Sequence, residues 1–325
     1  MPPQKTTIDV AALLGPTAMG KSRLATIIAP RLGAEIVSVD SMQVYRGMDI
    51  GTAKPDSEVR RRIPHHLMDI VDTTENFSVA EYQKAARVAV EDIARGGKLP
   101  LLVGGTGLYF EAVVFDISFP PGSMDDTLRK ELEEWAARDP EGLKAELKRV
   151  DPKFASTQSY ANMRRVIRAM EVYKRTGVPI SSFHKPRGRQ ALHFPYVGAV
   201  ITAPGHLRRK AIDARVEQMI QCGLVEEVKR LKEEGNLSAT ARQALGYKEI
   251  LHHLDSGLPL EETINIIKKR SWHYSRRQLT WFRRIPGLRW FDLGEEDLVS
   301  ESPPVVEEIL AYFVRELGKM REGRK

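Results

Sequence analysis

The sequence predicts an α/β fold in which helices flank a parallel sheet, with a helical insertion domain and a helical C-terminal part. Three observations support this prediction. Apolar runs at residues 8–14, 34–39 and 99–103 have the length and composition of buried strands. Helical patterns lie between these runs, as the crossovers of a parallel sheet require. A glycine-containing loop follows the first run directly.

This loop, at residues 15–22, has the spacing of a phosphate-binding loop, so the predicted sheet is P-loop NTPase-like. Its glycines let successive backbone N–H groups turn toward an anion, and the following helix adds the positive end of its dipole. Lys21 can reach terminal phosphate oxygens, and Ser22 can ligate Mg²⁺. The residues predicted to hold a diphosphate or nucleotide are Gly15, Pro16, Thr17, Ala18, Met19, Gly20, Lys21 and Ser22.

Two more strand ends are expected beside the loop. The run at residues 34–39 ends in Asp40, and the run at residues 99–103 continues into a glycine-rich segment that contains Thr106. In a parallel sheet, ligands gather at the carboxyl ends of the strands. We therefore expect Asp40 and Thr106 to face the same crevice as the loop.

The helical insertion is predicted where strand-like runs vanish. Before the insertion, a helix is predicted at residues 78–95, because Ser78 and Glu81 form a capping box at its start. After residue 119, amphipathic patterns predict helices at residues 125–137, 141–150 and 162–176.

Strand character returns at residues 196–202, which we expect to rejoin the sheet. We predict helices for the remainder, at residues 206–222, 224–233, 240–254 and 260–284. The predicted domains are therefore 1–119 for the first part of the core, 120–193 for the helical insertion, and 194–325 for core completion and basic C-terminal helices.

The composition indicates an anionic partner. The 325 residues carry a formal net charge of +7, and such an excess is typical of proteins that bind nucleic acid. Cys222 is the single cysteine, which excludes an intrachain disulfide and a cysteine zinc cluster and fits a reducing compartment. No apolar run is long enough to span a membrane, and the first residues lack the apolar core of a signal peptide. We expect a cytoplasmic, soluble protein without membrane contact.

Two basic clusters are candidate nucleic-acid contacts. Arg164, Arg165 and Arg168 share a face of one predicted helix, although a solvated face explains three arginines equally well. Residues 268–284 contain seven basic residues, no Asp or Glu, and several aromatic residues. Because basic side chains follow phosphates and aromatic rings stack on unpaired bases, this run favours contact with a nucleic acid over a solvated face.

The motifs fit more than one chemistry. A kinase uses such a loop for ATP, but its acidic Mg²⁺ ligand and its arginine lid cannot be assigned here. Alternatively, the diphosphate is a leaving group that departs from carbon, with Lys21 and Mg²⁺ stabilising its charge and Asp40 accepting a proton from an attacking amine. Prenyl transfer to a free mononucleotide and a nucleotide-switched RNA-binding protein are further alternatives. The basic run argues against the mononucleotide, which needs no such surface.

A set of motifs resembles those of the tRNA dimethylallyltransferases, also called tRNA isopentenyltransferases, of the bacterial type. The motifs occur in the family's order, span most of the chain and are highly specific as a set. Ala211 stands where the family often has arginine, and Trp272 stands near a usual threonine. The matching stretches are GPTAMGKS at 15–22, DSMQVY at 40–45, GTAKP at 51–55, GGTGLY at 104–109, RVIRAME at 165–171, QALGYK at 243–248 and RQLTWF at 277–282.

The resemblance implies an activity and its partners. The family transfers a dimethylallyl group from dimethylallyl diphosphate to the N6 amine of the adenosine 3′ of the anticodon, in tRNAs that read UNN codons. Mg²⁺ is the implied cofactor, with Ser22 as its protein ligand, and the anticodon stem-loop is the implied partner. We expect a monomer. Because the adenine must reach a pocket at a strand end, we expect it to be flipped out of its stack.

The resemblance also implies roles for individual residues. Asp40 is the implied general base, Thr106 contacts the adenine and the donor, and Arg215 contacts the diphosphate. The implied tRNA contacts are Asp40, Ser41, Met42, Gln43, Thr106, Arg129, Arg164, Arg165, Val166, Ile167, Arg168, Gln243, Ala244, Leu245, Gly246, Tyr247, Lys248, Arg277 and Arg283.

Overall fold

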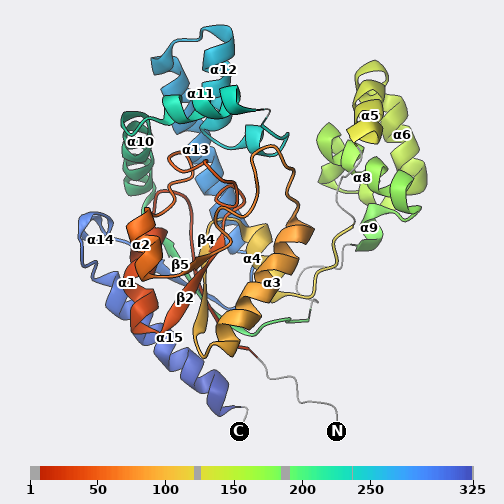
Figure 1. Cartoon of the computed structure of the whole chain (residues 1–325). Coiled ribbons are helices and arrows are strands. Elements are labelled where there is room, and N and C mark those ends of the chain that lie inside the picture. Colours follow the sequence, from red (N-terminus) through yellow and green to blue (C-terminus); the bar gives the residue numbers. More distant parts are fainter. Residues whose placement is uncertain (1–7, 121–125, 184–190, 236, 324–325) are drawn as a thin grey trace. The chain divides into compact units, whose positions relative to one another are not determined.

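The chain divides into two units in a computed structural model that describes residues 8–120, 126–183, 191–235 and 237–323 (Figure 1). Unit 1 comprises residues 1–77, 81–114 and 192–325, and unit 2 comprises residues 78–80 and 115–191. The insertion expected at residues 120–193 overlaps unit 2.

Unit 1 is built on a six-stranded sheet in which every neighbouring pair of strands is parallel. The predicted α/β fold class is confirmed. The strand order is β3-β2-β4-β1-β5-β6. The strands are β1 (Val10–Leu14), β2 (Ala34–Val39), β3 (His65–His66), β4 (Leu99–Gly104), β5 (Tyr196–Thr202) and β6 (Leu288–Asp292).

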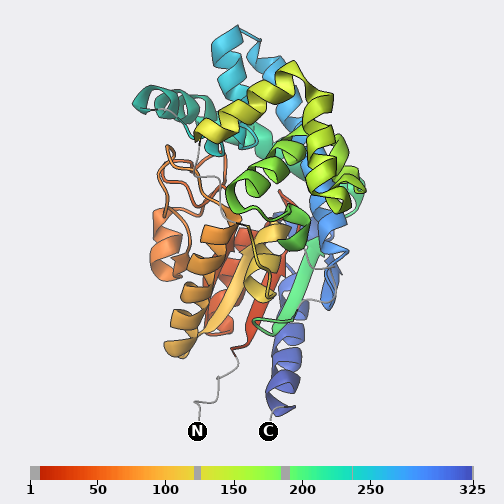
Figure 2. The same cartoon turned by 90° about the vertical axis from the view of Figure 1, so that its right-hand side faces the viewer.

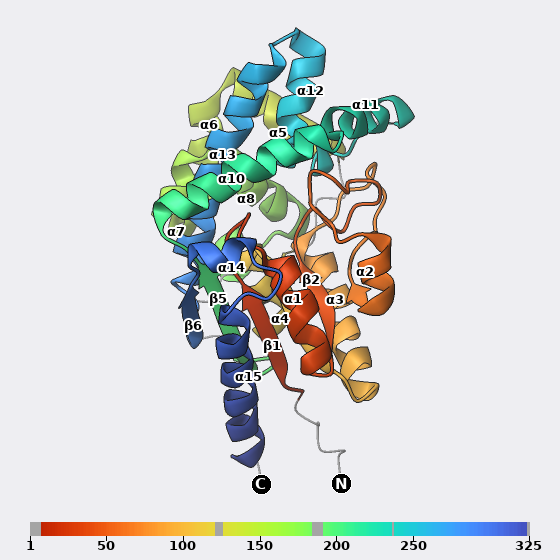
Figure 3. The same cartoon turned by 90° about the vertical axis from the view of Figure 1, so that its left-hand side faces the viewer.

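Helices cover both faces of the sheet, because the central strands are apolar on both sides. Helices α1 (Lys21–Arg31) and α15 (Val305–Glu322) pack on one face (Figure 3). Helices α3 (Val79–Arg95) and α4 (Gly107–Val114) pack on the other (Figure 2). There, the Tyr82 ring stacks on Tyr109, and its hydroxyl donates to the Ser38 carbonyl at 2.8 Å.

The C-terminal part of unit 1 is not wholly helical, which corrects the sequence-based expectation. It contributes β6 and the long helix α15 to the sheet and its cover. The helix predicted at residues 240–254 is interrupted at Gly246, whose φ of 93° is left-handed. The remaining elements are α2 (Ser57–Arg62), α10 (Gly205–Gln221), α11 (Leu224–Glu234), a 3₁₀ turn (Ala241–Gln243), α12 (Tyr247–Ser256), α13 (Leu260–Phe282) and α14 (Glu295–Val299).

Unit 2 is helical and has its own hydrophobic core, which includes Leu132, Leu143, Leu147, Val166 and Met170. No helix in the described part of the chain combines the length and the apolar character needed to cross a bilayer. The elements of unit 2 are α5 (Asp126–Arg138), α6 (Pro140–Val150), α7 (Pro152–Ala155), a 3₁₀ turn (Gln158–Ala161), α8 (Met163–Thr176) and α9 (Ile180–Phe183).

The register of the sheet brings three strand ends together. Leu14 of β1 lies opposite Gly104 of β4, and Val39 of β2 lies opposite the same glycine. The segments that follow these strands begin with Gly15, Asp40 and Gly105. The phosphate-binding loop, Asp40 and the segment with Thr106 therefore leave the same edge of the sheet.

Candidate active site at the carboxyl edge of the sheet

The loop after β1 curls back on itself. Ala18 and Gly20 have left-handed φ angles of 66° and 72°, and the Lys21 ammonium donates to the Pro16 carbonyl at 2.7 Å. Helix α1 begins at Lys21, and its N-cap, Gly20, supplies no side-chain acceptor. The first-turn N–H groups of α1 can therefore donate to an anion held in the loop.

Asp40 is held by its own turn. Its Oδ1 accepts the backbone N–H groups of Met42 at 2.8 Å and Gln43 at 3.4 Å. The Thr106 hydroxyl accepts the N–H of Ser41 at 3.2 Å, which joins the end of β4 to the end of β2. Thr106 therefore lies beside the turn that carries Asp40, although Thr106 is not among the residues that line the two cavities at this edge.

Two cavities open at this edge of the sheet. The larger, of about 950 Å³, is lined by the loop from Thr17 to Ser22, and the smaller, of about 540 Å³, by the segment 243–246 that precedes α12. The two cavities share a wall, which is formed by residues that line both of them. The shared residues are Thr17, Ala18, Asp40, Thr52, Arg215, Met219 and Tyr274.

The shared wall carries an excess of positive charge. Desolvation and the nearby Arg215 guanidinium lower the pKa of Lys21 to about 7, while the Asp40 carboxylate opposes the shift. Desolvation also lowers the pKa of Arg215, again opposed by Asp40. Two desolvated cations face one carboxylate, so the site is complementary to an additional anion such as a diphosphate.

Sequence reasoning missed two residues of α13 that complete the wall. The Gln278 amide accepts the Thr17 N–H at 2.9 Å and donates to the Gly105 carbonyl at 2.9 Å, so it joins the loop to the end of β4. Tyr274 lines both cavities, and burial raises the pKa of Tyr274 to about 12. The available signal was a polar residue, Gln278, on the buried face of a helix.

The smaller cavity collects several predicted tRNA contacts. Ser41, Met42, Gln243, Ala244, Leu245, Gly246, Lys248 and Arg277 line it. Two others have side chains engaged within the protein. The Gln43 amide binds Ser38 and Thr52, and the buried Tyr247 donates to Glu227.

The basic run of residues 268–284 is partly neutralised by carboxylates from other helices. Lys268 pairs with Glu217 of α10 at 2.6 Å, and Arg270 pairs with the buried Glu249 of α12. The Arg283 guanidinium lies over the ring of Trp290, 5.9 Å from its centroid. The positive surface of α13 is therefore smaller than the sequence indicates.

Several aromatic side chains of this run make contacts within the protein. Phe282 is fully buried, and Trp281 Nε1 donates to Glu111 at 3.0 Å. The guanidinium groups of Arg208 and Arg209 lie over the Trp272 ring, 5.3 and 5.8 Å from its centroid. Base stacking by Phe282 is therefore excluded in this arrangement.

In unit 2, α8 divides by face. Val166 and Ile167 lie in the core, so their side chains cannot reach a nucleic acid in this fold. Arg168 pairs with the fully buried Glu171 at 2.9 Å, and Arg129 lies 3.8 Å from the same carboxylate. Among the tRNA contacts predicted for unit 2, only arginine side chains remain available. These are Arg164 and Arg165, together with Arg168 and Arg129, whose guanidinium groups lie beside Glu171.

Comparison with known proteins identifies a family. The family model described as IPP transferase matches residues 43–285. The chain is 48% identical over 304 residues to a tRNA dimethylallyltransferase of Moorella thermoacetica, covering 92% of this chain and 94% of that protein. It is 42% identical over 318 residues to a tRNA dimethylallyltransferase of Geobacillus thermodenitrificans, covering 97% and 98%.

Two solved structures are similar over most of the chain. A tRNA isopentenylpyrophosphate transferase of Bacillus halodurans superimposes with a TM-score of 0.69 and 38% identity, covering 97% of this chain and 99% of that one. A eukaryotic dimethylallyltransferase acting on tRNA gives a TM-score of 0.74 and 30% identity, covering 88% and 74%.

Proposed function

The chain belongs to the IPP transferase family, and we propose that it is a prenyltransferase that transfers a dimethylallyl group from dimethylallyl diphosphate to tRNA. Its relatives are named tRNA dimethylallyltransferases, and a structural relative acts on tRNA. The observation that carries the proposal further is the shared wall of two cavities, with Asp40 and Arg215 in it. A donor on one side and an acceptor base on the other meet at these two residues.

The larger cavity receives the donor. Its diphosphate lies in the loop of Thr17 to Ser22, where backbone N–H groups and the Lys21 ammonium bind phosphate oxygens. Arg215, beside Lys21, supplies a second cation. Both cations stabilise the charge that grows on the diphosphate as its bond to carbon breaks.

The smaller cavity receives the acceptor, the N6 amine of the adenosine 3′ of the anticodon in tRNAs that read UNN codons. The amine nitrogen attacks the C1 carbon of the donor, the C1–O bond breaks, and the diphosphate leaves with the bonding electrons. Asp40 accepts the proton that the nitrogen loses. Thr106 holds the turn that carries Asp40 in place, because its hydroxyl accepts the Ser41 N–H.

Mg²⁺ is the proposed cofactor, and the residues present fit it. Mg²⁺ commonly takes one or two protein oxygens and completes its coordination with substrate phosphates and water. The Ser22 hydroxyl lines the donor cavity at the start of α1. When bound, the ion neutralises charge on the diphosphate and makes it a better leaving group.

The net charge and the lining of the cavities bear on the substrate, the compartment and the oligomeric state. A tRNA substrate fits the +7 net charge of the chain and an enzyme that works in the cytoplasm. Every residue that lines the two cavities belongs to unit 1, and we propose that the protein acts as a monomer.

The function is tested by replacing Asp40 with asparagine. Asp40→Asn keeps an oxygen for the Met42 and Gln43 N–H groups but cannot take a proton, so we expect kcat to fall by about 10²–10⁴-fold. Wild-type and variant protein are incubated with tRNA, Mg²⁺ and dimethylallyl diphosphate, and the nucleosides are analysed by mass spectrometry.

Binding of inorganic diphosphate and of tRNA is measured in parallel and should change little in Asp40→Asn. Labelled ATP serves as the alternative donor, because a kinase would transfer its phosphoryl group. Prenylation by Asp40→Asn at the wild-type rate would remove Asp40 as the base. Phosphoryl transfer without prenylation would overturn the proposed function.

A further inference from the structure

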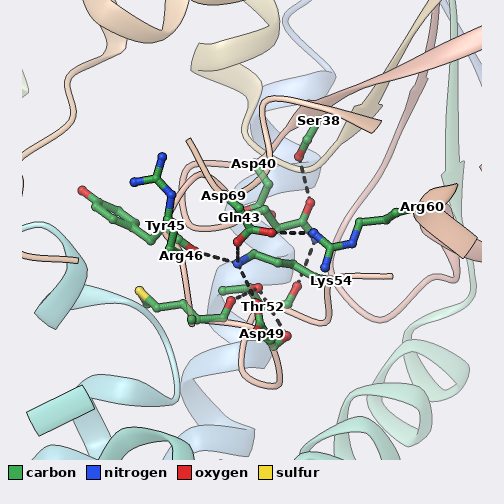
Figure 4. Close-up of polar contacts among 12 residues, drawn as sticks. Ser38, Asp40, Gln43, Tyr45, Arg46, Asp49, Thr52, Lys54, Arg60 and Asp69 are labelled. Atoms are coloured by element: carbon green, nitrogen blue, oxygen red, sulfur yellow. Dashed lines mark hydrogen bonds and ion pairs between the residues drawn. The ribbon is translucent and has the colours of Figure 1, made fainter. Parts of the chain in front are cut away.

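The motif Gly51-Thr52-Ala53-Lys54-Pro55 lines the site through Thr52 and also contains a buried lysine, to which the reaction described above gives no role. The Lys54 side chain is only 1% exposed. Its ammonium donates to the Tyr45 carbonyl at 2.6 Å, to Asp49 at 2.8 Å and to Asp69 at 2.5 Å (Figure 4). Because burying an ammonium is costly unless every donor is satisfied, this arrangement fixes all three partners relative to one another.

A buried carboxylate holds the same segment from the side of α11. Glu227, 7% exposed, accepts the backbone N–H groups of Asp49 at 3.0 Å, Ile50 at 2.8 Å and Gly51 at 3.3 Å. It also accepts the phenol of Tyr247, and desolvation and the Glu227 charge raise the pKa of that phenol. Three backbone donors on one carboxylate leave the segment little freedom to move.

The segment connects directly to the turn that carries Asp40. The Gln43 amide nitrogen donates to the Thr52 carbonyl at 3.1 Å, and its oxygen accepts the Ser38 hydroxyl at 2.8 Å. The backbone N–H of Gln43 lies 3.4 Å from Asp40 Oδ1. Figure 4 shows Gln43 between Thr52 and the Asp40 turn. Gln43 therefore links residues 49–54 to the turn that carries Asp40.

The packing around the segment is tight. A Cβ added to Gly51 would lie 2.3 Å from Cε2 of Tyr247, so the phenol ring rests against the backbone there. Ala53 and Asp69 both have left-handed φ angles, of 48° and 55°. Non-glycine residues adopt this conformation only where surrounding contacts hold them, and such strain gathers at functional sites.

We propose that the segment Asp49–Lys54 positions the Asp40 carboxylate for the transfer step, with Glu227 and Lys54 as its positioning residues. The inference rests on the proposed function, because it assigns the segment to the base of that reaction. Tyr247 opens α12, whose neighbouring Gly246 and Lys248 line the acceptor cavity. The base and the wall of the acceptor cavity thereby share one support, Glu227.

The test separates positioning from donor binding. In Glu227→Gln, one oxygen becomes an NH₂ group that cannot accept the Gly51 N–H. We expect kcat with saturating tRNA and donor to fall by about 10–100-fold, since a shift near 1 Å costs up to about 100-fold. The Kd of inorganic diphosphate should change less than about twofold, because the loop at Thr17 to Ser22 makes none of these contacts.

Two variants keep the test decisive. Tyr247→Phe removes only the phenol–carboxylate hydrogen bond and should lower kcat in the same direction, by less. Glu234→Gln, on the exposed end of α11, removes a surface ion pair with Arg230 at 2.9 Å and is the matched control. Its kcat and diphosphate Kd should both equal those of the wild type.

Amide hydrogen exchange supplies a readout that does not depend on activity. In Glu227→Gln, the amides of residues 40–46 should exchange faster, while those of α1 should not. Unchanged kcat and exchange in both folded variants would overturn the inference. So would a proportional loss of kcat and diphosphate binding, which indicates general loosening. If the wild type prenylates no RNA, the proposed function fails, and exchange alone then decides the inference.

Discussion

At the scale of single residues, Lys21 shows how the site is prepared for its ligand. Burial and Arg215 together lower the pKa of Lys21 to about 7, against the opposing effect of Asp40. In the unfolded chain the same amine titrates near 10.5. Between these values the unfolded chain binds the extra proton, so this group makes the unliganded protein more stable as pH rises from about 7 toward 10.5.

A bound diphosphate should reverse this shift, because its negative charges favour the ammonium form. We therefore predict that the protein takes up a proton through Lys21 when it binds inorganic diphosphate at pH 8, and takes up less at pH 6. Calorimetric titrations in buffers of different ionisation enthalpy measure the uptake. Lys21→Arg is the control, since its guanidinium stays charged throughout. Equal proton uptake in the wild type and in Lys21→Arg would contradict the assignment.

At the scale of elements, α13 supplies both structure and site. Its buried stripe includes Ser271, Ser275 and Gln278, which are unusual residues for the core side of a helix. One of these polar groups, the Gln278 amide, joins Thr17 of the loop to Gly105 after β4. The helix therefore sets the distance between the diphosphate loop and the strand end next to Thr106.

We predict that Gln278→Leu weakens diphosphate binding by about 10-fold and lowers the free energy of unfolding by about 1–3 kcal/mol. The reason is that the Thr17 N–H and the Gly105 carbonyl each lose a partner in a part-buried setting. Calorimetric titration with inorganic diphosphate and chemical denaturation measure the two effects. Thr280→Ala, an exposed change on the same helix, should leave both unchanged. Wild-type binding by Gln278→Leu would show that the bridge does not shape the loop.

At the scale of the whole molecule, the two units have separate hydrophobic cores. Both cavities lie in unit 1, and unit 2 is stabilised by its own cluster around Leu143 and Leu147. Changes at the surface of α8 should therefore leave the diphosphate site intact. Within α8, Arg168 is committed to the buried Glu171, whereas Arg164 and Arg165 are exposed.

We predict that Arg164→Gln combined with Arg165→Gln weakens tRNA binding and reduces the slope of log K against log salt by about 1 for each lost phosphate contact. Diphosphate affinity should not change. The control removes two positive charges of unit 2 that are paired, through Lys144→Gln and Arg149→Gln. A salt slope that falls equally in both double variants would indicate an effect of net charge and not of a binding face.

The sequence by itself determined the α/β class, four of the six strands, the loop, the sheet edge at which Asp40 and Thr106 lie, and the family, because each depends on short-range order. A strand, a glycine turn and a helix start are neighbours in the chain, and parallel strands then share one edge. Local pattern also placed Arg164, Arg165 and Arg168 together on one face of a helix, which is α8.

Only the tertiary structure decided which distant groups meet. Gln278 reaches Thr17 across 261 positions of sequence, and Glu227 reaches Asp49 across 178. The carboxylates that neutralise Lys268 and Arg270 come from other helices. The sequence of residues 268–284 therefore indicates more unpaired positive charge than the folded protein has. Such partners are selected by how helices rotate and pack against one another, and that choice depends on the whole core, which no local periodicity encodes.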